Sequence, residues 1–355
     1  MTNRPKSVIL YEQYKFIQQC IQKGKHMKKL SIILVLMALF CVILTAVSCG
    51  ESATTTADTT KSTTPAATTT TLPTVSTTLP ATTPVVTTTT TAVTTTAITT
   101  TTVATKPDPD MSPVSKTISI ASAFKKKTFE ASNGIDLPYR IFVPEDYSEE
   151  YAYPLVLFLH GAGERGNNNT SQLNNVIPNL FKEKDSPFYH AIVIAPQCPT
   201  DMQWVDTPWA NGSYLLKRTP ISEPMTAVVE LLDYIVENYS VNQNRQYVTG
   251  LSMGGFGTWD LLMRYPERFA AAIPYCGAAD PNQAANLAKI PIWTFHDTKD
   301  TTVPCKGTQA VVKRIQEAGG TLITYTETSQ YGHDVWTPGS QTEGLFEWLF
   351  AQRKK

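Results

Sequence analysis

The sequence predicts one mixed α/β domain in its C-terminal part, built on a mostly parallel, doubly wound sheet. Antiparallel strands are expected at its start and helices on both of its faces. Short, nearly continuous apolar runs recur from residue 155 onward, and such runs are typical of parallel strands buried on both faces. Helical stretches separate these runs, and strand–helix alternation of this length indicates a parallel sheet covered by helices.

The expected elements follow one another from residue 127 to residue 352. Two early strands, 127–130 and 138–143, flank an Asn-Gly turn at 133–134 and form a hairpin or meander. Buried strands are expected at residues 155–159, 191–195, 246–249, 269–274, 292–295 and 322–325. Helices are expected at residues 224–238, 255–264, 309–318 and 343–352. In the first helix, one face carries apolar residues at helical spacing, namely Val228, Leu231, Leu232 and Ile235. The sequence shows no internal repeat.

A threonine-rich segment accounts for much of the chain's length. Residues 51–110 contain 29 threonines among 60 residues, with almost no charge and no aromatic side chain. Such a composition buries too little apolar surface to offset the entropy of ordering the chain. The sequence therefore predicts a Thr/Pro-rich linker at residues 50–115 and a single folded domain at residues 116–355.

The N-terminal part resembles an export signal. Met27 and two lysines precede an 18-residue apolar run, 30–47, and a small-residue boundary follows. Residues 44–49 are similar to a bacterial lipobox, so Cys49 is the expected lipidated residue and Met27 the expected true start. An uncleaved membrane anchor and free secretion are the alternatives. Residues 1–49 are thus an N-terminal extension and signal peptide, and all three interpretations place the domain outside the cytoplasmic membrane.

The composition of the domain excludes several partners. From residue 116 onward it contains 21 basic and 25 acidic residues without a basic stripe, which argues against nucleic acid. The domain has three cysteines, Cys198, Cys276 and Cys305, and their spacing is not typical of a metal site. Two alternatives remain: one disulfide with a free thiol, or three buried thiols. The chain has no phosphate-binding glycine motif, so neither a metal nor a cofactor is expected.

The strongest local motif is Gly-Leu-Ser-Met-Gly at residues 250–254. It lies where the predicted strand 246–249 meets the helix that begins near residue 255, which is G-x-S-x-G in a strand–turn–helix context. The glycines leave room for a sharp turn that lifts the hydroxyl of Ser252 above the sheet edge, at the positive end of the helix. Ser252 is therefore the predicted nucleophile.

A serine nucleophile needs a base and an acid, which follow such a serine motif in the order acid, then histidine. His333 lies in a polar, glycine-bearing loop between the last strand and the last helix, and it is the predicted base. Asp297 and Asp300 both follow the strand at 292–295. Asp300 is favoured because it lies further around the loop, nearer to an approaching His333. Its role would be to fix the tautomer of His333 and to stabilise the imidazolium.

An anionic tetrahedral intermediate also requires hydrogen-bond donors. The residue after the nucleophile, Met253, supplies one backbone N–H, and Ala162 in the glycine-rich loop after strand 155–159 is the expected second donor. His160, which begins this loop, is expected to support it rather than act as a base. An ion pair between Glu164 and Arg165 is expected to brace the loop.

Several blocks of the sequence resemble one family of α/β-hydrolases. They lie at residues 153–166, 195–199, 250–255 and 332–336, with the Asp300 loop between the last two. The blocks are similar to bacterial extracellular esterases of the phospholipase/carboxylesterase type, which are related to feruloyl esterases, polyhydroxybutyrate depolymerases and prolyl-oligopeptidase-type catalytic domains. The likeness runs from about residue 128 to the C-terminus and implies a triad of Ser252, Asp300 and His333. Asp297 stands where the family often has glycine.

The resulting hypothesis is an extracellular serine esterase acting through an acyl-enzyme. The resemblance suggests acetyl or feruloyl esters of plant polysaccharide or its fragments as substrates. The long connection between residues 197 and 223 is rich in aromatic residues, and Trp204 in it is the expected substrate contact. A serine peptidase acting on short peptides and a non-catalytic surface binding module are the alternatives.

Overall fold

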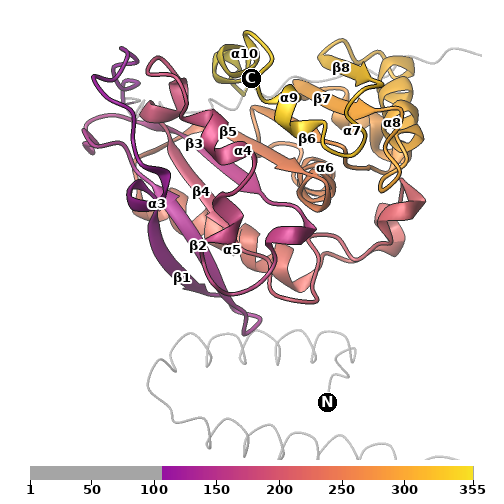
Figure 1. The fold of residues 1–355 in the computed structure, drawn as a ribbon, viewed down its shortest axis with the longest axis horizontal. Coiled ribbons are helices and arrows are strands. Elements are labelled where there is room, and N and C mark those ends of the chain that lie inside the picture. Colours follow the sequence, from indigo (N-terminus) through magenta and orange to yellow (C-terminus); the bar gives the residue numbers. More distant parts are fainter. Residues whose placement is uncertain (1–105, 355) are drawn as a thin grey trace, which may run out of the picture. The chain divides into compact units, whose positions relative to one another are not determined.

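The computed structural model describes residues 106–354 (Figure 1). The predicted start at Met27, the predicted lipidation of Cys49 and most of the predicted linker 50–115 lie outside this range. No helix in the part of the chain that the structure describes combines the length and apolar character needed to cross a bilayer.

One eight-stranded sheet forms the centre of the described part, in the order β1-β2-β4-β3-β5-β6-β7-β8. Its strands are β1 (Lys125–Glu130), β2 (Asp136–Phe142), β3 (Tyr153–Leu159), β4 (Ile192–Pro196), β5 (Val241–Leu251), β6 (Ala271–Tyr275), β7 (Ile292–Asp297) and β8 (Ile323–Thr328). β2 pairs antiparallel with β1 and with β4, and every pairing from β4 to β8 is parallel. The predicted mostly parallel sheet with antiparallel strands at its start is confirmed.

The two faces of the sheet bury two separate apolar clusters. Along β3, Leu155, Leu157 and Leu159 belong to one cluster, whereas Val156 and Phe158 belong to the other. Successive side chains of a strand point to opposite faces, so a strand buried on both sides must be apolar throughout. This explains why β3 and β4 are continuous apolar runs in the sequence.

Helices cover both faces of the sheet (Figure 1). They are α3 (Ile120–Ala123), α4 (Val176–Leu180), α5 (Glu223–Asn238), α6 (Met253–Arg264), α7 (Ala284–Leu287), α8 (Lys306–Glu317), α9 (Trp336–Gly339) and α10 (Leu345–Ala351). Helices α5, α6, α7 and α8 contribute to the cluster that contains Leu157, and α4 and α10 contribute to the cluster that contains Phe158. The long helix α5 begins where Ser222 accepts a hydrogen bond from the backbone N–H of Met225, with Pro224 in the first turn.

The folded part begins before residue 116, where the sequence placed the domain boundary. The carbonyl of Pro107 accepts a hydrogen bond from the N–H of Ala152. The carboxylate of Asp108 contacts the guanidinium groups of Arg245, 3.3 Å away, and Arg353, 2.5 Å away. These partners are distant in sequence, so the polar composition of residues 106–115 alone could not reveal them. This short stretch belongs to the domain rather than to the linker.

Candidate active site

Ser252 occupies a sharp turn between β5 and α6. Its φ of 54° and ψ of −117° lie in a region that non-glycine residues rarely adopt, so surrounding structure must hold the turn. A Cβ at position 254 would overlap the backbone carbonyl of Leu159 on the neighbouring strand, which explains the glycine there. The strained turn places Ser252 at the N-terminus of the 12-residue helix α6, as the sequence motif predicts.

His333 contacts the serine hydroxyl directly. It lies in the loop between β8 and α9, and its Nε2 is 2.9 Å from Oγ of Ser252. The ring of Trp336 meets the ring of His333 edge-on, with 5.2 Å between the centroids. The thiol of Cys276 donates a 3.5 Å hydrogen bond to the backbone carbonyl of His333. These contacts fix the imidazole in reach of the hydroxyl proton.

The acid that reaches His333 is Asp300. Its Oδ2 is 2.7 Å from Nδ1 of His333, and its Oδ1 accepts hydrogen bonds from the backbone N–H groups of Thr302 and Val303. Burial favours a higher pKa for this carboxyl, but the histidine contacts and the Val303 N–H outweigh burial and hold its pKa well below the usual range. Asp300 is therefore ionised, and its Oδ2 accepts a hydrogen bond from the Nδ1–H of His333.

Asp297, the other acid left open by the sequence, has a different set of partners. Its Oδ2 accepts hydrogen bonds from the hydroxyl of Thr328 and from the backbone N–H groups of Gln330 and Tyr331. Burial opposes ionisation, but these donors and the N–H of Lys299 lower the pKa of Asp297 below its ordinary value. Asp297 thus ties the start of the histidine-bearing loop to the end of β7.

Two backbone N–H groups follow the carboxyl ends of β3 and β5, which are parallel neighbours in the sheet. Met253 is the first residue of α6, and Ala162 begins a short 3-10 helix, Ala162–Glu164. Among the described residues, neither N–H donates to a protein acceptor, so both remain free for a substrate oxygen. The sequence singled out both residues as donors, and the structure leaves both N–H groups unoccupied.

His160 supports the loop that carries Ala162. Its Nδ1 donates to the carbonyl of Gly161, 2.6 Å away, and its Nε2 accepts from the N–H of Cys198, 2.9 Å away. The carbonyl of Gly161 and the N–H of Ala162 belong to one planar peptide, so the first bond fixes the direction of the second group. Burial lowers the pKa of His160 to about 4, which keeps the ring neutral near pH 7.

The expected ion pair in this loop is not formed. Glu164 accepts a hydrogen bond from the amide of Asn175. Arg165 donates instead to the carbonyls of Ala162 and Met202, and its guanidinium lies 5.8 Å from the ring centroid of Trp209. Arg165 therefore braces the loop as expected, but it does so through carbonyl oxygens.

The predicted substrate contact of Trp204 is corrected by its burial. Its side chain is fully buried, and its Nε1 donates a 3.1 Å hydrogen bond to the carbonyl of His160. An inaccessible ring cannot stack on a substrate, so Trp204 supports the His160 loop from inside the core. Trp209, which lies in the same connection, is only half-buried.

The connection between β4 and α5 joins two loops of the site. Arg165 links it to the Ala162 loop, as described above. Further along the connection, Gly212 has a φ of 59° and lies so close to the acid loop that a Cβ would come within 2.9 Å of the Pro304 carbonyl oxygen. The connection therefore extends from the Ala162 loop to the loop that contains Asp300 and Pro304.

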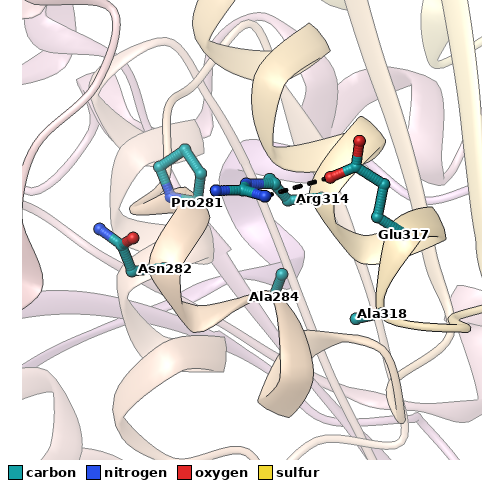
Figure 2. A pocket seen from close by; sticks show the side chains of 6 residues that line it. All are labelled: Pro281, Asn282, Ala284, Arg314, Glu317 and Ala318. Atoms are coloured by element: carbon teal, nitrogen blue, oxygen red, sulfur yellow. Dashed lines mark hydrogen bonds and ion pairs between the residues drawn. The ribbon is translucent and has the colours of Figure 1, made fainter. Parts of the chain in front are cut away.

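One surface cavity of about 340 Å³ lies away from the serine (Figure 2). It is lined by Pro281, Asn282, Ala284, Arg314, Glu317 and Ala318, and Arg314 contacts Glu317 on the same helix, α8, at 3.2 Å. None of the lining residues belongs to the Ser252, His333 and Asp300 arrangement. We assign the chemistry to the serine site because that is where the nucleophile, base and acid converge.

The cysteines of the domain do not form a disulfide. Cys198, Cys276 and Cys305 are all free and buried. Cys276, Asp300 and His333 have potential ligand atoms within 4.8 Å of one another, the only such group among residues 106–354. Burial raises the pKa of Cys276 well above that of an ordinary thiol, and the other two groups are hydrogen-bonded to each other. The thiol of Cys276 also hydrogen-bonds to the carbonyl of His333, so we interpret these residues as a hydrogen-bonded cluster.

The mostly parallel sheet and the strained serine turn at its carboxyl edge define an α/β-hydrolase. A model of the family described as Phospholipase/Carboxylesterase matches residues 146–341, more than half of the chain. The chain belongs to this family.

Similar proteins carry esterase names. "Probable feruloyl esterase C" of Aspergillus niger is 22% identical over 198 residues, which cover 56% of this chain and 67% of that protein. "Probable carboxylesterase SOBER1-like" of Arabidopsis thaliana is 24% identical over 221 residues, covering 57% and 79%. A solved structure of a thermostable esterase is 36% identical with a TM-score of 0.60, covering 66% of this chain and 64% of that chain. The present chain thus spans just under two thirds of that esterase.

The sequence analysis assigns no role to one residue beside the acid. His296, at the end of β7, lies with its Nε2 3.3 Å from Oδ2 of Asp300. The signal that could have found it is a histidine at the end of a buried strand, four residues before the acid.

Proposed function

We propose that this protein is a serine esterase that hydrolyses carboxylic esters through an acyl-enzyme. The observation that carries the proposal is the continuous line of contacts from Ser252 through His333 to Asp300, with distances of 2.9 and 2.7 Å. Such a line allows a base to remove the serine proton while an anion stabilises the imidazolium that forms.

The proposed first half-reaction transfers the acyl group to the enzyme. Oγ of Ser252 attacks the ester carbonyl carbon while Nε2 of His333 takes the hydroxyl proton. The resulting oxyanion accepts hydrogen bonds from the N–H groups of Met253 and Ala162, whose directions are fixed by α6 and by the His160 contact. When the intermediate collapses, the C–O bond to the alcohol breaks and His333 gives its proton to the departing oxygen.

The second half-reaction releases the acid. Water attacks the acyl carbon of the ester on Ser252 while His333 removes a water proton. The bond between the acyl carbon and Oγ then breaks, and the proton returns to Oγ. Throughout, Asp300 stays ionised and keeps the proton of His333 on Nδ1.

The proposed substrates are acetyl or feruloyl esters of plant polysaccharide or its fragments. The esterase names of the similar proteins support an ester substrate, and one of them is named as a feruloyl esterase. The connection between β4 and α5 supports an aromatic or ring-containing substrate, because the half-buried Trp209 in it lies beside Arg165 of the Ala162 loop.

We also propose that the domain is displayed outside the cytoplasmic membrane. The signal-like run at residues 30–47 and the lipobox-like residues that end at Cys49 support attachment through a lipid on this cysteine. Labelled palmitate should enter the wild-type protein in its native host and not a Cys49→Ala variant. Equal labelling of both proteins would refute lipidation at this residue.

The decisive experiment compares wild type with Ser252→Ala on p-nitrophenyl acetate, p-nitrophenyl butyrate, methyl ferulate and aminoacyl-p-nitroanilides. Ser132→Ala is the matched control, because Ser132 lies in the β1–β2 turn and bonds to Glu230. We expect ester turnover in wild type and in the control, and none in Ser252→Ala. Anilide turnover alone would indicate a peptidase, and no turnover by a folded wild type would indicate a binding module.

A further inference from the structure

A second histidine contacts the acid of the proposed triad. His296 is the residue before the last one of β7 and is fully buried, as is the side chain of Asp300. Both imidazoles approach the same oxygen: Nδ1 of His333 lies 2.7 Å from Oδ2 of Asp300, and Nε2 of His296 lies 3.3 Å from it. The second imidazole has no part in the proton transfers described above, so its position needs another explanation.

The surroundings of His296 determine where its proton lies. Nε2 is 3.0 Å from the backbone carbonyl of Val303 and 3.3 Å from Oδ2 of Asp300. Both neighbours are acceptors, and an unprotonated nitrogen would repel both of them. Nε2 must therefore carry a proton, which hydrogen-bonds to the Val303 carbonyl and lies beside the carboxylate.

The other nitrogen of this ring is also held. Nδ1 of His296 lies 2.8 Å from the hydroxyl oxygen of Thr308 on α8, and this hydroxyl is 3.0 Å from the carbonyl of Gly277. The ring is thus clamped between the acid loop and a helix, and its orientation cannot relax without breaking buried hydrogen bonds.

We propose that His296 is a positioning residue for Asp300, acting on both carboxylate oxygens. Its Nε2–H lies against Oδ2 directly. The same N–H also donates to the carbonyl of Val303 and so holds this residue in place. The backbone N–H of Val303 in turn donates to Oδ1 of Asp300 at 2.9 Å. The carboxylate is held in contact with His333, and the N–H of His296 compensates part of its negative charge. This inference rests on the proposed esterase reaction.

The compensation has a chemical consequence for His333. A carboxylate with the N–H of His296 beside it attracts the proton on His333 less strongly, so the imidazolium of His333 is stabilised less. Removing the N–H of His296 would raise the proton affinity of His333. Because the base must be neutral to attack, the acid limb of the pH profile would then move to higher pH.

Other titratable groups around this cluster do not change charge in that range. The thiols of Cys276, at the end of β6, and Cys305, just before α8, are buried, and burial raises the pKa of each. Asp297, on the strand that carries His296, is ionised because its hydrogen bonds lower its pKa. The acidic groups near these thiols are Asp334, which follows His333, and Glu327 on β8. They are the same in every variant below.

The test compares His296→Leu with His296→Gln on p-nitrophenyl butyrate across pH 5 to 9. Leucine removes the N–H, whereas glutamine can place an amide N–H near the position of Nε2. For His296→Leu we expect kcat to fall about tenfold with little change in KM, and the acid limb of kcat/KM to move up by about half a pH unit. His296→Gln should recover most of kcat and keep the limb near that of wild type.

Thr294→Val is the control for damage to the buried strand that carries His296. Thr294 is buried and donates to the carbonyl of Pro274 rather than to His296 or Asp300, so this variant should lose stability without moving the acid limb. Titration of the downfield proton on Nδ1 of His333 by NMR should show the same shift in His296→Leu, independent of turnover. An unmoved limb in an active, folded His296→Leu variant, or equal shifts in the leucine and glutamine variants, would overturn the inference. Wild type without esterase turnover would instead overturn the proposed function.

Discussion

Replacing Asp300 with asparagine probes the proposed mechanism most directly, because the amide is nearly the same size as the carboxylate. The amide oxygen can keep the two bonds that Oδ1 accepts from the N–H groups of Thr302 and Val303. The amide NH₂ would then face Nδ1 of His333 in place of Oδ2. A donor at that place favours the tautomer with the proton on Nε2, which points at Ser252 and cannot accept its proton.

The expected loss in kcat is about 10³- to 10⁴-fold, which corresponds to roughly 4 to 5.5 kcal/mol of transition-state stabilisation. KM should change little, because the aspartate does not touch substrate. Steady-state turnover of p-nitrophenyl butyrate measures both quantities. Circular dichroism and thermal melting establish that the variant is folded.

Asp297→Asn is the matched control, three residues earlier, at the end of β7. An amide at this position cannot accept all of the bonds that the N–H groups of Lys299, Gln330 and Tyr331 and the hydroxyl of Thr328 now make. We expect a loss of about 2 kcal/mol in the free energy of unfolding, about 4 to 8 °C in Tm, and less than a tenfold loss in kcat. A larger kcat loss in Asp297→Asn than in Asp300→Asn would refute the assignment of the acid.

Three further outcomes follow from the described contacts. The pKa values of Asp297 and Asp300 are lowered by folding, so their contribution to stability is complete above the unfolded value of about 3.9 and is lost as pH falls below it. Urea midpoints should therefore decline below about pH 4, and a flat profile from pH 6 to 2 would contradict the hydrogen-bond assignment. Trp204→Phe should lower Tm and leave KM for aromatic and acetyl esters equal to that of wild type. A selective rise in KM for methyl ferulate would instead support a substrate contact of Trp204. Alkylation mapped by mass spectrometry should spare Cys198 and Cys276 in the native protein and modify both after denaturation, since burial raises the pKa of each thiol.

The parts of the molecule that follow local rules could be predicted from the sequence. The serine turn is encoded within five residues, because glycine at 254 leaves room for the carbonyl of Leu159. The parallel strands could be recognised because burial on both faces demands continuous apolar runs, as in β3. Both features depend on residues that are neighbours in the chain or on one-dimensional patterns.

The parts that depend on distant contacts could not be predicted in the same way. The choice between Asp297 and Asp300 is made by donors on β8 and its following loop, which bond to Asp297 and leave Asp300 to His333. The burial of Trp204 depends on how a long connection folds over the His160 loop. Similarly, the early start of the domain rests on the pairing of Asp108 with Arg353 near the other end of the chain.

The contacts of Pro107 and Asp108 also determine which side of the enzyme can be covered. They join residues that precede β3 and begin β5, at the amino ends of these strands, and Arg353 brings the C-terminal end of the chain to the same place. Ser252 and Asp300 follow the carboxyl ends of β5 and β7, at the opposite edge of the sheet. A resin attached next to Pro107 or Arg353 would therefore meet the edge that carries no chemistry. Immobilisation at either of these places should leave turnover of a bulky ester close to that of the free enzyme.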